Sequence, residues 1–205
     1  MPVKGKSKKE VVTEFRTAEL LEAARRVFAA KGFHDATVDE IADAAGIAKG
    51  TVYLYYRSKS EIYWEALRGG IEDLAEQTKK SVEAAKSAED KIRAFISTQM
   101  VFLEERRDFF KIYFSEFGNV LTHPAQVSRH FQELYLSQIR LLESVLAEAV
   151  KKKALGKLRV DATAYALADL TRAMITQRLL GWSKGSLLED IDFVFALIWK
   201  GIAHR

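Results

Sequence analysis

Proline is almost absent from this sequence, and that scarcity constrains the fold more than any other feature. Only Pro2 and Pro124 occur among 205 residues, so long helices can form with few interruptions. Apolar residues recur three and four positions apart through most of the chain, and no window alternates as a strand would. The sequence therefore predicts an all-α protein of about nine helices.

Helix start and stop signals divide the chain into these elements. A first helix is predicted at 15–31, followed by Gly32, which suits the left-handed residue that often ends a helix. Capping boxes, in which Ser or Thr precedes an acid by three residues, begin at Thr37, Ser58, Ser87 and Ser186. Three short helices are expected before Arg57. The later ones are expected at about 59–81, 88–106, 108–117, 124–153 with Pro124 in its first turn, 161–183 and 187–203.

Composition narrows the class of protein. Cysteine is absent, which removes disulfides and thiolate metal sites and fits a reducing compartment. The basic start has no apolar stretch behind it, and no run of about 18 uncharged apolar residues occurs, so we expect a cytoplasmic protein without a membrane span. His123 and His130 lack an acidic partner at matching spacing, and no phosphate loop or nucleophile elbow is present. We therefore expect no enzyme, no cofactor and no metal site.

The small positive net charge of +4 is concentrated at the beginning of the chain. Lys4, Lys6, Lys8 and Lys9 lie in a basic arm, residues 1–12, which we predict to be disordered. A solvated tail and an arm that contacts phosphates are both consistent with this charge.

Residues 38–57, VDEIADAAGIAKGTVYLYYR, have the spacing of a helix-turn-helix. Ala42 is small enough for two helices to cross closely, and Gly46, four residues later, can adopt the positive φ of a tight turn. Val52 then follows at a distance that buries it against Ile41. The pattern predicts that the second helix of this pair presents its other side to solvent.

The predicted outer side of this second helix is poor material for a protein core. Successive residues turn by about 100°, so Val52 and Tyr56 are expected to point inward. The expected outward residues are Lys49, Thr51, Tyr53 and Tyr55. Lysine and phenol hydroxyls reach phosphate oxygens, threonine can touch a thymine methyl, and Gly50 lets the backbone approach closely. An aromatic patch under a neighbouring helix is the alternative, which we accept for Tyr56 alone.

The segment TVDEIADAAGIAKGTVYLYYRSKSEIYWEAL resembles the N-terminal DNA-binding domain of the TetR family of transcriptional regulators. The resemblance runs from about Phe15 to Leu67. It implies a DNA-binding domain at 13–57 and a helical effector-binding and dimerisation domain at 58–205. Carried over by position, it implies DNA contacts from Thr37, Lys49, Gly50, Thr51, Tyr53, Tyr55 and Lys59.

One recognition helix reads few base pairs, so such a protein is expected to bind its double-stranded DNA operator as a homodimer. Residues 191–202, IDFVFALIWKGI, are apolar all round, and 161–183 are similar. A monomer could bury both helices in its own core. We favour a four-helix bundle between two subunits, with interface residues Leu167, Leu170, Met174, Phe193, Leu197 and Ile198.

The middle helices are rich in aromatic residues, most of which we expect in the core. The resemblance implies a small-molecule effector pocket in this region. An aromatic lining would suit an apolar effector, fatty-acyl-like or drug-like. Candidate ligand contacts are Gln99, Phe102, Tyr113, Phe117, Tyr135, Thr171, Arg172, Ile175 and Arg178. We expect a repressor released by its effector; a dimeric DNA-binding protein without an effector is the main alternative.

Overall fold

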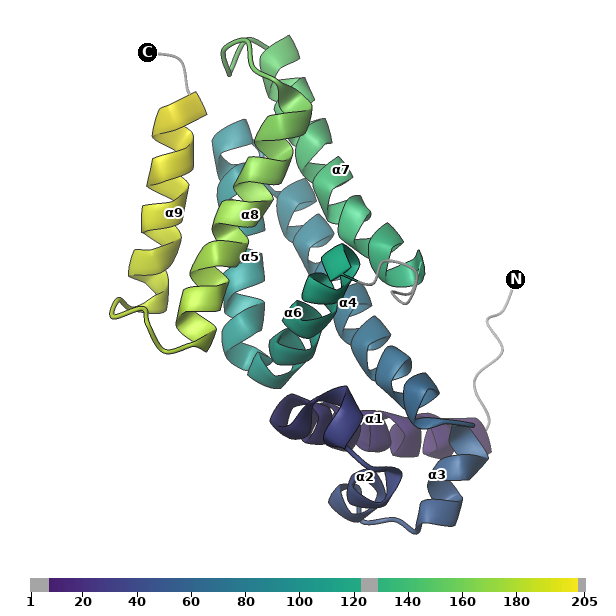
Figure 1. Ribbon diagram of the computed structural model, residues 1–205. Helices are drawn as coiled ribbons and strands as arrows, with labels where there is room; N and C mark the ends of the chain where they lie inside the picture. Colours follow the sequence, from purple (N-terminus) through teal and green to yellow (C-terminus); the bar gives the residue numbers. More distant parts are fainter. Residues whose placement is uncertain (1–7, 123–128, 203–205) are drawn as a thin grey trace, which may run out of the picture. The chain divides into compact units, whose positions relative to one another are not determined.

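The computed structural model describes residues 8–122 and 129–202, and nine α-helices account for most of them. Figure 1 shows their order along the chain. Their bounds are α1 (Lys8–Asp35), α2 (Val38–Ala44), α3 (Lys49–Tyr55), α4 (Lys59–Ala84), α5 (Ala88–Glu105), α6 (Arg107–Thr122), α7 (Arg129–Lys151), α8 (Val160–Leu179) and α9 (Leu187–Ile202). The predicted all-α fold is confirmed.

The chain divides into two compact units. Unit 1 is Met1–Gly70 with Asp108–Pro124, so it holds α1 to α3, the first part of α4 and most of α6. Unit 2 is Ile71–Arg107 with Ala125–Arg205, so it holds the rest of α4 together with α5, α7, α8 and α9. The boundary between the units thus falls inside α4, and α6 belongs to unit 1 although it follows α5 of unit 2 in the sequence. The predicted functional boundary was a single point after Arg57.

Several helix ends differ from the expected positions, and two of them have a clear local cause. α1 begins at Lys8 because no helix breaker lies between Lys8 and Phe15, so Lys8 to Val12 belong to this helix and not to a disordered arm. The remainder of the predicted arm, residues 1–7, lies outside the described residues. α8 was expected to reach residue 183 but ends at Leu179. Gly181 adopts a φ of 71°, and the amide of Trp182 donates to the carbonyl of Gln177 at 2.8 Å, which closes the helix earlier.

Unit 1 has an apolar core crossed by one buried polar contact. Leu20, Phe28 and Ile62 are almost fully buried there. The Tyr63 hydroxyl donates to the Glu116 carboxylate, which joins α4 to α6 within this unit. Both side chains are buried, so the pair satisfies two polar groups that would otherwise be costly in an apolar environment.

Gly70 is required by close packing inside α4. A Cβ atom built on Gly70 would lie 2.3 Å from Cδ2 and 2.5 Å from Cε2 of the Phe109 ring. Phe109 is itself buried, so it has no free space into which to retreat. The neighbouring Gly69 has nothing within 4 Å of the corresponding position. A glycine is therefore needed for packing at only one of the two positions.

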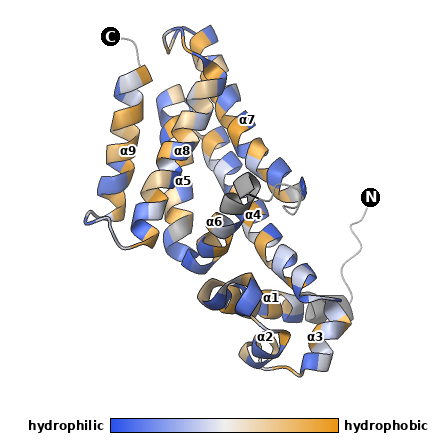
Figure 2. Ribbon diagram, viewed as in Figure 1, coloured by the Kyte–Doolittle hydropathy of each residue, from blue (hydrophilic) through white to orange (hydrophobic). Residues whose placement is uncertain are grey.

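Unit 2 is a helical bundle in which α5 contacts α7, α8 and α9. Its core is formed by apolar side chains that include Ile92, Ile96, Met100, Phe102, Ile139, Leu146, Ile175 and Val194. Figure 2 shows α9 as mainly hydrophobic along its length. No helix within the described residues is both long and apolar enough to cross a membrane.

Candidate nucleic-acid interface

The turn between α2 and α3 has the geometry that its sequence predicts. Gly46 adopts a φ of 66°, and the amides of Gly46 and Ile47 donate to the carbonyls of Asp43 and Ala42 at 3.1 and 3.0 Å. This double hydrogen bond ends α2 and directs the chain into α3. Val52 is completely buried, as expected, and it holds α3 against the core of unit 1.

The start of α2 is fixed by the predicted capping box at Thr37. The Thr37 hydroxyl accepts from the Glu40 amide at 3.2 Å, and the Glu40 carboxylate accepts from the Thr37 amide at 3.0 Å. The Lys31 ammonium also donates to Glu40 at 2.5 Å. The hydrogen bond from Lys31, followed by the one from the Thr37 amide, lowers the pKa of Glu40. Thr37 is therefore an exposed residue held in one position by its own cap.

The outward face of α3 includes one residue that the sequence analysis did not select. Lys49 and Gly50 are exposed, and Tyr53 is 46% exposed. Leu54, which sequence analysis did not select, is 82% exposed and is the most exposed large apolar side chain of the described residues. It lies two residues, about 200°, from buried Val52, so a helical projection contains the signal that places it outside.

Thr51 and Tyr55 are half-buried rather than fully outward. They lie about 100° and 60° around the helix axis from the completely buried Val52, so they flank the buried side of α3. The Tyr56 assignment to the interior is confirmed. Burial raises the pKa of its phenol to about 12.

The two lysines selected at this surface already have partners within unit 1. The Lys49 ammonium donates to the Asp39 carboxylate at 2.8 Å, and this hydrogen bond raises the pKa of Lys49. The Lys59 ammonium donates to the carbonyls of His34 and Ala36 at 3.0 and 2.8 Å. It also lies 4.7 Å from the centre of the Phe33 ring, so Lys59 holds the link between α1 and α2 in place.

The polar candidates for an effector site are engaged in bonds inside unit 2. Gln99 donates to Thr78 and Gln138 at 3.4 and 3.3 Å. Thr171 bonds the carbonyl of Leu167 one turn earlier in α8. These contacts tie α4, α5 and α7 together in unit 2 and leave Thr171 occupied within its own helix.

The remaining ligand candidates are spread over both units. Arg172 donates to the Tyr135 hydroxyl at 3.0 Å and pairs with Asp169 at 2.6 Å. Phe102 and Ile175 are buried in unit 2, whereas Tyr113 belongs to unit 1. The side chain of Phe117 lies outside the described residues.

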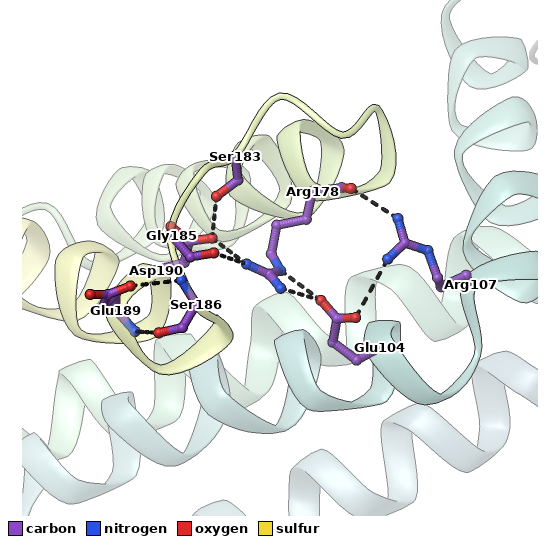
Figure 3. Close-up of polar contacts among 8 residues, drawn as sticks. All are labelled: Glu104, Arg107, Arg178, Ser183, Gly185, Ser186, Glu189 and Asp190. Carbon is purple, nitrogen blue, oxygen red and sulfur yellow. Dashed lines mark hydrogen bonds and ion pairs between the residues drawn. The ribbon is translucent and has the colours of Figure 1, made fainter.

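Arg178 is the centre of a polar network that local sequence patterns did not reveal (Figure 3). Its Nε donates to Glu104 at 2.7 Å, and its Nη1 donates to Asp190 at 2.6 Å and to the carbonyl of Gly185 at 3.1 Å. Its Nη2 also bonds Glu104, so every guanidinium nitrogen is engaged. Arg107 adds a bond to the carbonyl of Arg178 at 3.0 Å. The network joins α5, the end of α8 and the start of α9, and this use conflicts with a ligand-contacting role for Arg178.

The predicted interface residues divide into two sets. Leu167, Met174 and Ile198 are buried within unit 2, because their sides of α8 and α9 face the bundle. Phe193 and Leu197 are 56% and 52% exposed on α9, and Leu170 is half-buried. The first three residues therefore serve the core of one protomer, and the outer face of α9 holds the residues available to a partner. Within the described residues, no group of three metal-ligating side chains comes together.

Known proteins are similar to this chain in its N-terminal part and over most of its length. Residues 20–66 match the family described as bacterial regulatory proteins, tetR family. The HTH-type transcriptional repressor KstR2 of Rhodococcus jostii is 29% identical over 126 residues, which cover 59% of this chain and 62% of that protein. The chain therefore spans slightly less than two thirds of this relative.

Two solved structures match nearly the whole chain. A putative fatty acid metabolism regulator of Clostridium perfringens is 28% identical, with a TM-score of 0.74 over 91% of this chain and 100% of the other. FadR of Bacillus subtilis, solved in complex with stearoyl-CoA, is 20% identical, with a TM-score of 0.73 over 90% and 98%. The second likeness establishes the fold alone.

Proposed function

Because this chain belongs to the TetR family of bacterial regulatory proteins, we propose that it is a homodimeric transcriptional repressor that an apolar effector releases from its operator. The observation that carries the proposal is the α2–α3 pair. Its Gly46 turn and buried Val52 present Lys49, Tyr53 and Leu54 to solvent on a helix fixed to the core of unit 1. A rigid helix with an exposed polar and aromatic face is the form in which a helix-turn-helix enters the major groove.

The proposed DNA contacts have distinct chemical roles. Tyr53, Thr51 and Tyr55 supply hydroxyl groups for phosphates or base edges, and Gly50 permits close backbone approach. Thr37 reaches a phosphate from the start of α2. Lys59 donates two of its three N–H groups to carbonyls of unit 1, so the third can donate to a phosphate.

Substitution at α3 tests the DNA-binding part of the proposal. We expect Tyr53→Ala to weaken binding to an operator, selected from random DNA with the wild-type protein, by at least ~10-fold through lost groove contacts. Lys79→Ala removes an exposed lysine from unit 2 and is the matched surface control, with no expected change. Operator binding should fall by ~10³ or more between 50 and 200 mM salt if about six phosphates are neutralised. A wild-type protein that selects no DNA sequence refutes the proposed function.

Dimerisation is proposed through the outer faces of α8 and α9. Phe193 and Leu197 lie four residues apart on α9, and α8 exposes the small residues Ala162, Ala166 and Ala173. Small side chains on one helix let another helix pack closely, and the exposed apolar residues supply the area that association buries. Two such helices from each subunit would form a four-helix bundle.

Sedimentation equilibrium tests this interface. Leu197→Asp should shift the protein from dimer to monomer, because an unpaired carboxylate would be buried at the subunit contact. Leu136→Asp introduces the same charge at an exposed apolar position of α7 and should leave the dimer intact. A monomeric wild type, or two variants that remain dimers, contradicts the proposed interface.

The effector is proposed to be a long-chain acyl compound. The support is the aromatic and aliphatic content of the helices and the likeness to fatty acid metabolism regulators, one of which was solved with stearoyl-CoA. The mechanism is a population shift, in which the effector binds better to a conformation that fits the operator poorly. Stearoyl-CoA titrated into the operator complex should dissociate it, with free CoA as the control. Saturating bound effector without a change in operator affinity supports the effector-independent alternative instead.

A further inference from the structure

The contact between Asp39 and Lys49 places an acid on the surface proposed to face DNA. Asp39 lies in the first turn of α2, and Lys49 is the first residue of α3. Their charged atoms are 2.8 Å apart, and the two side chains are 61% and 49% exposed. The contact therefore lies in solvent, within reach of a bound nucleic acid.

We propose that Asp39 is a specificity-determining residue of the DNA interface, which turns Lys49 from a phosphate-binding cation into a reader of neutral base edges. The inference rests on the proposed DNA-binding function. A lysine ammonium has three N–H donors, and Asp39 takes one of them. The paired group keeps two donors but carries little net charge toward a third partner.

A loss of net charge affects the two kinds of DNA contact differently. Phosphate binding depends on the full positive charge of the lysine, because the lysine replaces counterions that are condensed on the DNA and releases them into solution. A hydrogen bond to guanine O6 or N7 needs a donor in the right place and depends less on net charge. Pairing of Lys49 with Asp39 therefore weakens contacts to phosphates, which every DNA sequence has, more than it weakens hydrogen bonds to the bases of one particular sequence.

The geometry also favours a base contact for Lys49. The first residues of a recognition helix lie deepest in the major groove, where base edges are reached. Asp39 comes from the preceding helix and limits the positions that the flexible lysine side chain can occupy. A phosphate that approached Lys49 would either meet the Asp39 carboxylate or have to displace it, and both outcomes are unfavourable.

The test compares operator and random DNA for Asp39→Asn, which keeps the size of the side chain and removes its charge. Affinity for random DNA should rise by up to ~8-fold at 0.1 M salt, and the slope of log affinity against log salt should steepen by ~0.9, as for one added phosphate contact. The ratio of operator to random affinity should fall. Asp43→Asn removes the same charge from an exposed residue of the same helix and should change the ratio less than twofold.

A double-mutant cycle separates the pair from a simple change in net charge. In a Lys49→Ala background, Asp39→Asn should no longer alter the salt slope, because the released ammonium is missing. An undiminished effect in that background, or equal effects of Asp39→Asn and Asp43→Asn, overturns the inference. Circular dichroism of each variant checks that α2 is intact. Failure of the proposed function is distinguishable, since the wild-type protein would then select no DNA at all.

Discussion

The two units use polar side chains in opposite ways. In unit 1 the polar residues selected by the motif are exposed or half-buried, and several have a second role inside the unit, as Thr37 and Lys59 show. In unit 2 the polar residues selected as ligand contacts, such as Gln99 and Arg178, are taken up by bonds between helices. The exposure of a polar side chain in a helical protein is thus easier to predict when a local motif also fixes its orientation.

The two units also differ in the kind of interaction that constrains Gly70 in unit 1 and Arg178 in unit 2. Gly70 of unit 1 is fixed by direct contact with an aromatic ring, whereas the network around Arg178 of unit 2 is fixed by charge and hydrogen bonding. Steric and electrostatic constraints respond differently to substitution and to pH. Substitutions and changes of pH can therefore test the constraint in each unit separately.

The largest effect is expected at the charged network of unit 2. Arg178→Met should lower the free energy of unfolding by about 3–5 kcal/mol, because Glu104 and the largely buried Asp190 would lose their compensating charge. Urea denaturation followed by circular dichroism measures the change. Arg159→Met removes an arginine at the start of α8 whose pair with Asp161 is fully solvent-facing, and it should cost less than about 0.5 kcal/mol.

Equal stabilities for these two arginine variants would show that the Arg178 network contributes nothing to folding. Its residues would then return as candidates for effector binding. The comparison between the units would lose its main support, because polar groups in unit 2 would be as available as those in unit 1.

The second effect concerns packing in unit 1. Gly70→Ala should destabilise the protein by about 1–3 kcal/mol, because the new methyl group overlaps the Phe109 ring and the core must shift. Urea denaturation followed by circular dichroism measures the change. An unchanged midpoint would mean that Phe109 moves aside freely, contrary to its burial.

Local signals explain which parts of the fold and the site were predictable. The turn at Gly46 and the cap at Thr37 each depend on residues within about one helical turn of one another, and the burial of Val52 follows from its spacing within one motif of 20 residues, so a short window contains each signal. The end of α8 was missed because Gly181 was read as part of a long apolar helix.

Long-range pairing explains what the sequence did not reveal. Arg178 and Glu104 are 74 positions apart, and no local pattern connects them. The inner side of α8 was also ambiguous, because apolar residues lie around this helix and its hydrophobic periodicity is weak, and the sequence analysis treated α9 in the same way. Leu167 and Ile198 were therefore assigned to an interface although they lie in the core.

The third effect is alkaline destabilisation, to which two buried tyrosines of unit 1 should contribute. Burial raises the pKa of Tyr56 to about 12, and burial together with the hydrogen bond to Glu116 raises the pKa of Tyr63. A phenol with a raised folded-state pKa favours the folded protein fully below about pH 10, and this advantage is lost as pH rises through the folded-state pKa. Tyr56 alone should cost roughly 1.4 kcal/mol at pH 11.

Ultraviolet absorbance of tyrosinate, combined with denaturation at pH 8 and 11, measures this loss. Tyr56→Phe should unfold with a smaller difference between the two pH values, since its ring cannot ionise. An equal pH dependence in this variant would assign the alkaline loss to other groups, such as Tyr135 of unit 2, whose pKa burial also raises.

The smallest effect is expected at Gly69, one residue from the position where alanine should be harmful. Gly69→Ala should stabilise the protein by about 0.5–1 kcal/mol, because the added methyl group meets open space and alanine loses less backbone entropy in a helix. Thermal and urea denaturation against the Gly70→Ala variant give the comparison directly. Opposite signs at adjacent positions would show that α4 is limited by helix propensity at Gly69 and by side-chain packing at Gly70. Destabilisation at both would instead mean that α4 requires a glycine at Gly69 for a reason that packing within unit 1 does not supply.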